Sequence, residues 1–163
     1  MRILIASIGH DTLTDLGFGP QIIRRLQTLG LPENVETEDF STSAVVALHK
    51  LTEKKYDKLI FVSALQRGGK PGTIYKEEPD VKLPEESEIQ ERMAESISGA
   101  ISLDNTLIIC GYYKALPKDV ILIGVEPELT SPGLSLTKTL QEVAQKVIEL
   151  VLEEIEVKEG RRV

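Results

Sequence analysis

The chain has 163 residues and carries 26 acidic against 19 basic side chains, a formal net charge of −7. A chain of this length fits one domain, residues 1–163, and its negative charge disfavours nucleic acid or an anionic membrane as a general partner. Aromatic residues make up only 4% of the sequence and tryptophan is absent, so platforms for base stacking are not expected either.

The sequence contains one cysteine, Cys110, so no internal disulfide can form. No apolar run approaches the roughly 20 residues that cross a bilayer. No amino-terminal stretch combines a basic leader with a small-residue cleavage site. We therefore expect a cytoplasmic protein with no membrane partner.

The first predicted strand is the apolar run over residues 3–8, which suits a strand buried on both faces. Gly9 allows a sharp turn after it, and Pro20 pre-sets a helical φ in a first helical turn. A helix is predicted from Pro20 to Leu29, because its apolar residues recur on one stripe. The polar loop between strand and helix lies where open α/β sheets place their ligand sites.

The next segments alternate in the same way. A second strand is predicted over residues 35–39, followed by a helix capped by Ser41 or Thr42 that ends near Lys55. A central strand is predicted over residues 58–65 from its apolar and β-branched composition.

Residues 73–75 follow a glycine-rich turn and predict a short edge strand. The acidic segment 77–86 is expected to be a surface loop. After it, Ser87 and Gln90 have the spacing of a capping box, which predicts a helix that runs to about Ile97.

Residues 107–110 are four apolar residues that fit either a strand or a buried helix. Residues 120–125 predict a strand, and the stripe from Leu136 to Ile155 predicts an amphipathic helix packed on a sheet. The tail 158–163 is expected to fray.

The alternation of strand-like and helix-like segments along the chain predicts an α/β fold, a three-layer α/β/α sandwich with a mostly parallel sheet.

The loop after the first strand holds the most suggestive polar residues. His10 is followed by Asp11, with Asp15 four positions further on, so a His–Asp constellation is sterically conceivable. A loop histidine that satisfies local backbone groups explains the same residues without any site. The second histidine, His49, has no metal-ligand spacing to His10, and a metal site usually needs three or four protein ligands.

Other nucleophile and cofactor motifs are weak. Cys110 ends the run Leu-Ile-Ile-Cys, which is typical of a core residue, whereas a catalytic cysteine needs a cation or a helix amino terminus nearby. Ser7 and Ser63 lack the G-x-S-x-G elbow of serine hydrolases. The early glycines lack the G-x-G-x-x-G spacing of dinucleotide-binding proteins.

Several short motifs occur in a characteristic order. They are the first strand with Gly9, Leu13-x-Asp15-x-Gly17-x-Gly19, Asp39 after the second strand, Pro71-Gly72-Thr73 after the third, and residues 124–128 before 133–135. With them, nearly the whole chain resembles the hydrogenase maturation proteases, endopeptidases that trim the carboxyl terminus of the large subunit of nickel-iron hydrogenases. The resemblance implies a phosphorylase/hydrolase-like sandwich. The expected binding cleft comprises His10, Asp11, Asp15, Asp39, Ser63 and Glu126.

The resemblance also implies a departure from the family. Three residues hold nickel there, and the corresponding positions here are Leu16, Ser63 and, counting back from Pro117, about Gly99. Leucine cannot coordinate a metal, and a serine hydroxyl is a poor ligand beside imidazole and carboxylate. We therefore expect no metal and no other cofactor.

Three functions stay open at this point. The first is a non-catalytic or altered binding module for a hydrogenase large subunit or another protein tail. The second is an active endopeptidase in which His10 and Asp15 stand in for the missing groups. The third is a cysteine hydrolase that uses Cys110. The sequence sets no oligomeric state.

Overall fold

The computed structural model describes residues 1–98 and 102–157. Within these ranges five strands form one sheet in the order β2-β1-β3-β5-β4. Four strands run parallel, and β4 pairs antiparallel with β5 at the edge of the sheet. The strands are β1 Ile3–Ser7, β2 Val35–Asp39, β3 Lys58–Ala64, β4 Ile74–Glu77 and β5 Asp119–Val125. The predicted mostly parallel sheet with a short edge strand is confirmed.

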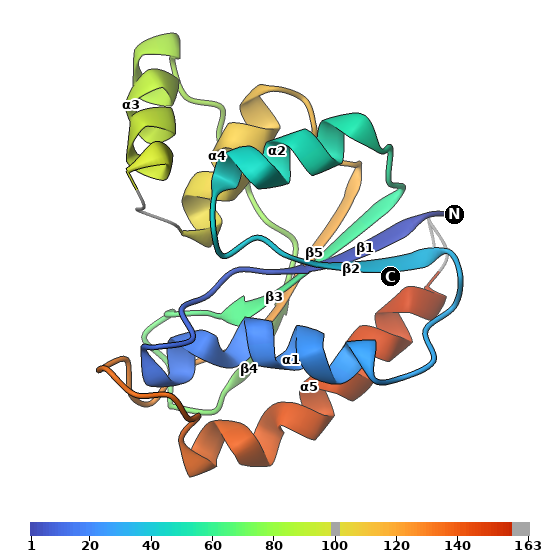
Figure 1. Cartoon of the computed structure of the whole chain (residues 1–163), viewed down its shortest axis with the longest axis vertical. Helices are drawn as coiled ribbons and strands as arrows, with labels where there is room; N and C mark the ends of the chain where they lie inside the picture. Colours follow the sequence, from blue (N-terminus) through green and yellow to red (C-terminus); the bar gives the residue numbers. More distant parts are fainter. Residues whose placement is uncertain (99–101, 158–163) are drawn as a thin grey trace.

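Helices cover both faces of this sheet (Figure 1). Helices α1 and α5 lie on one face, α2 and α4 lie on the other, and α3 packs outside α2 and α4. The helices are α1 Phe18–Gln27, α2 Ala44–Glu53, α3 Glu86–Ile97, α4 Leu103–Tyr112 and α5 Lys138–Glu156, with a 3₁₀ turn, η1, at Thr14–Gly17. The architecture is the predicted three-layer α/β/α sandwich.

Strand β1 shows how the two cores form. Its side chains alternate between the two faces, as those of every strand do. Ile3 and Ile5 join the core under α1 and α5, whereas Leu4 and Ala6 join the core under α2 and α4. All four side chains are fully buried, which is why the strand reads as a continuous apolar run.

Two predicted helix caps are wrong. Helix α2 is capped by Ser43, whose hydroxyl accepts from the backbone N–H of Val45, because Ser41 instead bonds to Asp39. Helix α3 begins at Glu86, so Ser87 lies inside the helix and forms no capping box. Acidic side chains in its first turn stabilise the positive end of the helix dipole without such a cap.

The segment left open at residues 107–110 belongs to helix α4. Its N-cap is Ser102, whose hydroxyl accepts from the backbone N–H of Asn105. The helix is buried between the sheet and two neighbouring helices, so it shows no amphipathic period. Helix α5 begins at Lys138, slightly later than predicted. The tail 158–163, predicted to fray, lies outside the described residues.

No helix within residues 1–98 and 102–157 has both the length and the apolar character needed to cross a bilayer.

Candidate functional site

A cavity lies at the carboxyl ends of β1 and β3, which are neighbours in the sheet. Its volume is about 260 Å³. The cavity brings together residues of the first loop, the end of β3 and the start of α4, which are far apart in sequence. Its lining residues are Ile8, Gly9, His10, Leu16, Ser63, Ala64, Leu65, Gln66, Arg67, Ser102, Leu103 and Asp104.

Two of the predicted cleft residues, His10 and Ser63, line this cavity together with Leu16. Ser63 is nearly buried, and its hydroxyl donates to the carbonyl oxygen of Ile8 at 2.8 Å. Leu16 is partly exposed in the cavity wall. The Ser63 hydroxyl is therefore already bonded to the protein's own backbone. Leu16 adds an apolar side chain to the cavity lining.

The first loop is held close to its own polypeptide. The backbone N–H of His10 donates to the carbonyl oxygen of Leu16 at 2.9 Å. A Cβ atom on Gly9 would lie only 2.3 Å from that oxygen. Glycine is therefore required at this position for the loop to close, as its place after the first strand suggested.

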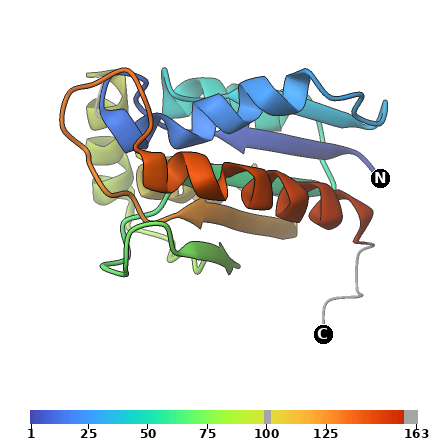
Figure 2. The ribbon, with the colours of Figure 1, turned by 90° about the horizontal axis from the view of Figure 1, so that it is seen from below.

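Asp15 does not line the cavity but fixes the loop from behind. Its carboxylate is fully buried and accepts hydrogen bonds from the backbone N–H groups of Glu128, Leu129 and Thr137 at 2.9, 3.0 and 2.8 Å. The Thr137 hydroxyl also donates to it. Both oxygens thus bind the segment 126–137, which Figure 2 shows in orange, arching beside the start of α1.

Thr14 adds a second connection between these two segments. Its φ is 48°, a left-handed conformation that is strained for a β-branched residue. Its backbone N–H donates to the carbonyl oxygen of Gly133 at 2.9 Å, and its hydroxyl donates to the carbonyl oxygen of Ser131. The first loop and the segment 126–137 therefore form one hydrogen-bonded unit that sets the position of Leu16.

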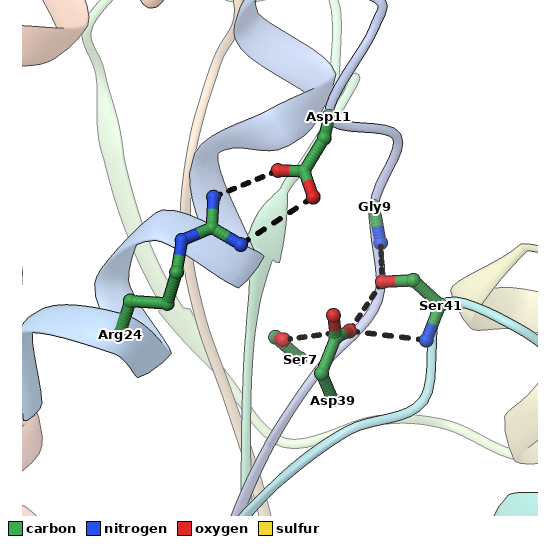
Figure 3. A network of polar contacts seen from close by, with 6 residues as sticks. All are labelled: Ser7, Gly9, Asp11, Arg24, Asp39 and Ser41. Atoms are coloured by element: carbon green, nitrogen blue, oxygen red, sulfur yellow. Dashed lines mark hydrogen bonds and ion pairs between the residues drawn. The ribbon is translucent and has the colours of Figure 1, made fainter. Parts of the chain in front are cut away.

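Asp39 and Asp11 also lie outside the cavity lining. Figure 3 shows the polar contacts that each of them makes. Asp39 accepts hydrogen bonds from the Ser7 hydroxyl at 3.2 Å and from the Ser41 backbone N–H at 3.0 Å. Asp11 is exposed and forms an ion pair with Arg24 at 2.9 Å. Asp39 therefore ties the ends of β1 and β2 together, and Asp11 ties the loop to helix α1.

Glu126 organises the turn after β3. Its carboxylate is nearly buried and accepts hydrogen bonds from the backbone N–H groups of Arg67 and Gly69 and from the Tyr75 hydroxyl. The Arg67 side chain is paired with Glu77, and that hydrogen bond raises the pKa of the guanidinium. Glu126 thus positions Arg67 at the cavity wall from outside the cavity.

A second cavity of about 700 Å³ adjoins the first, because Arg67 and Asp104 line both. Sequence reasoning missed these two residues. The position of Arg67 just beyond a predicted strand was a usable signal, whereas Asp104 precedes the ambiguous segment 107–110 and lies where no helix or strand was predicted. The other lining residues are Glu77, Glu78, Pro79, Asp80, Val81, Lys82, Arg92, Leu107, Ile108 and Leu122.

Cys110 lies inside the core between the sheet and α4. Its side chain is fully buried, and burial raises the pKa of its thiol to about 12. A protonated, inaccessible thiol does not suit a nucleophile. The structure therefore gives no support to the predicted cysteine hydrolase.

Gly99, the third position at which the resemblance implies a nickel ligand, lies outside the described residues. In the part of the chain that the structure describes, no three or more His, Cys, Asp or Glu side chains are grouped so as to hold a metal ion.

The chain is similar to known proteins over most of its length. The family model described as hydrogenase maturation protease matches residues 20–154. The hydrogenase 2 maturation protease of Escherichia coli is 29% identical over 155 residues, which cover 93% of this chain and 89% of that protein. The coenzyme F420 hydrogenase subunit delta of Methanothermobacter thermautotrophicus is 25% identical over 163 residues, 94% of each chain.

Solved structures of hydrogenase maturation proteases have a similar fold. The E. coli hydrogenase maturating endopeptidase superposes with a TM-score of 0.71 at 28% identity, covering 95% of this chain and 92% of that one. A hydrogenase 2 maturation peptidase from a Thaumarchaeota archaeon gives 0.67 at 26% identity, covering 97% and 100%. The fold and the match over most of the chain define the class, and the chain belongs to the hydrogenase maturation protease family.

Proposed function

We propose that this chain is a maturation protease-like binding module that holds the carboxyl-terminal tail of a hydrogenase large subunit, or another protein tail, without nickel and without cleaving it. The observation that carries the proposal is the cavity wall, where Leu16 and Ser63 occupy two positions at which the resemblance places nickel ligands. Family membership supports the tail as the bound group.

The donor chemistry of the cavity supports the absence of nickel. Leu16 has no donor atom, and the Ser63 hydroxyl donates to the Ile8 carbonyl. His10 is the one imidazole among the lining residues, and Asp104 is the one carboxylate. Nickel binding by imidazole and carboxylate would need a further ligand. These residues do not fit the metal, so no step of the function is routed through it.

The second candidate is the endopeptidase activity that the names of the relatives carry. His10 lines the cavity, and an imidazole is a side chain that commonly transfers protons in enzymes. Asp15 is not available as its partner, because both carboxylate oxygens accept hydrogen bonds from the segment 126–137. A protease would therefore depend on His10 with some group other than Asp15.

Two measurements on the full chain test the proposal. We expect calorimetric titration with nickel to show no stoichiometric binding, whereas a relative that carries the family's nickel ligands serves as the positive control. We expect a nickel-iron hydrogenase large-subunit precursor to form a complex with the chain on size-exclusion chromatography and to keep its intact mass. One nickel per chain that is lost in His10→Ala, or removal of the precursor's tail, would overturn the proposal.

A further inference from the structure

Several apolar side chains line the smaller cavity, beside polar ones such as His10 and Gln66. Leu16, Leu65 and Leu103 are among the apolar lining residues, and Leu65 and Leu103 are only 3% and 8% exposed. We infer that this cavity binds a single apolar side chain of an extended peptide, and that Leu16 determines this specificity. The inference deepens the proposed function and rests on its tail-binding part.

The size of the cavity fits this occupant. Its volume of about 260 Å³ lies just below the roughly 300–1,000 Å³ of typical small-molecule sites. Burial of a leucine- or phenylalanine-sized side chain against such a wall is favourable because it removes apolar surface from water. The Ser63 hydroxyl, which also lines the cavity, is not left without a hydrogen-bond partner, because it donates to the Ile8 carbonyl oxygen at 2.8 Å.

The adjoining cavity makes the binding surface elongated. Arg67 and Asp104 line both cavities and stand at their junction. A guanidinium donates and a carboxylate accepts, so this pair can bond the carbonyl and N–H groups of a peptide backbone. An extended polypeptide suits a surface of this shape better than a compact small molecule.

The charge of the larger cavity restricts the peptide further. Four carboxylates and three cations line it, and two of the cations already form ion pairs, Arg67 with Glu77 and Arg92 with Glu88. The lining of the larger cavity as a whole thus carries one more negative charge than positive charges. Neutral or basic peptides are therefore complementary to it, and acidic peptides are repelled.

Leu16 is preorganised for this role. The loop that carries it is closed by the hydrogen bond from His10 to its carbonyl oxygen and is fixed from behind by buried Asp15. A site that does not have to order itself on binding loses less affinity to conformational entropy. A substitution at Leu16 thus changes the chemistry of the wall and leaves the loop's backbone bonds in place.

The experiment is a titration of the ¹⁵N-labelled full chain with capped pentapeptides Gly-Gly-Xaa-Gly-Gly. With leucine or phenylalanine at the centre, we expect saturable shifts of the amide signals of His10, Leu16 and Ser63. Glycine at the centre should bind at least tenfold more weakly, because the apolar side chain is missing. Aspartate at the centre should produce no saturable shifts at these three amides.

The variant Leu16→Glu should lower the affinity for the leucine peptide at least tenfold. The matched control is Leu134→Glu, because Leu134 is 79% exposed and lies outside the cavity lining; it should bind as the unchanged chain does. Equal affinity for the glycine and leucine peptides, shifts elsewhere on the surface, or unchanged binding by Leu16→Glu would overturn the inference. If Leu16→Glu fails to fold, the peptide series on the unchanged chain still tests whether the cavity binds an apolar side chain.

The two proposals fail separately. If the precursor is cleaved but the leucine peptide binds in the cavity, only the non-catalytic function is wrong. If the precursor is bound intact but no apolar peptide reaches the cavity, only this inference is wrong.

Discussion

Buried charges serve different purposes at the two ends of the sheet. At the amino-terminal end, Lys58 is fully buried, and its ammonium lies 2.7 Å from a carboxylate oxygen of Glu154 and 3.6 Å from one of Asp119. At the carboxyl-terminal end, Asp15 and Glu126 are satisfied mainly by backbone N–H groups. The first arrangement holds helix α5 on the sheet, and the second shapes the loops around the cavity.

This difference explains why acidic residues near a binding cavity need not be part of its chemistry. A carboxylate whose oxygens accept several backbone hydrogen bonds is committed to the shape of a loop. Asp15 and Glu126 are of this kind. Asp39 accepts from one backbone N–H and from two serine hydroxyls, and none of the three carboxylates lines the cavity. The side chains that line the cavity are therefore those of His10 and its neighbours in the lining, and not these three carboxylates.

The largest expected effect comes from Lys58→Met, which leaves Glu154 and Asp119 without their shared cation. Removal of one partner of a buried ion pair costs about 3–5 kcal/mol. Urea unfolding followed by circular dichroism measures this loss. The control is Lys76→Ala, whose side chain is 43% exposed while pairing with the same carboxylate at 2.8 Å, and which should cost at most about 1 kcal/mol. Equal losses in both variants would contradict the contrast between buried and exposed partners.

The corresponding change at the cavity end is Asp15→Ala. Three backbone N–H groups lose their acceptor, so we expect a loss of about 3 kcal/mol in the free energy of unfolding. The loosened loop should also weaken binding of the leucine peptide. Asp11→Ala is the control, because its exposed ion pair with Arg24 should contribute less than about 1 kcal/mol. A stable Asp15→Ala protein with unchanged peptide binding would show that the loop is held by other contacts.

A smaller effect is expected for Glu126→Gln. The neutral amide keeps an oxygen that can accept from both Gly69 and Arg67, but its NH₂ group takes the place of the second oxygen, which accepts from the Arg67 backbone N–H at 3.0 Å. We expect a cost of about 1–2 kcal/mol. Thermal unfolding measures it. Exposed Glu128→Gln is the control and should change stability by less than about 0.5 kcal/mol. If both variants behave alike, Glu126 does not organise the turn.

The smallest effect concerns pH. Hydrogen bonds from Lys54 and Tyr56 lower the pKa of Glu36. The folded state therefore gains stability that is present at neutral pH and is lost as the pH falls through the lowered folded-state pKa. Tyr56→Phe should reduce stability by less than about 1 kcal/mol at pH 7. The difference from the unchanged chain should shrink toward pH 3 in urea titrations, and a constant difference would exclude the proposed linkage.

Local burial explains how much of the fold could be predicted. The parallel strands stood out because residues such as Leu4 and Ile5 are buried on opposite faces and leave a continuous apolar run. Helix α4 did not stand out, since contacts with the sheet, α2 and α3 bury it and remove the apolar stripe. The predicted cap of α2 is wrong because Ser41 bonds to Asp39 and not to the helix end.

The sequence by itself determined the α/β class, the family resemblance and the loop after β1 as the place to look, because these depend on periodicity and on short motifs. Only the tertiary structure decided what each polar side chain does. Asp15 meets Thr137, and Glu126 meets Arg67, across long stretches of chain. A residue's identity states which bonds it can form, but the direction of its side chain depends on partners that only the folded chain brings within reach.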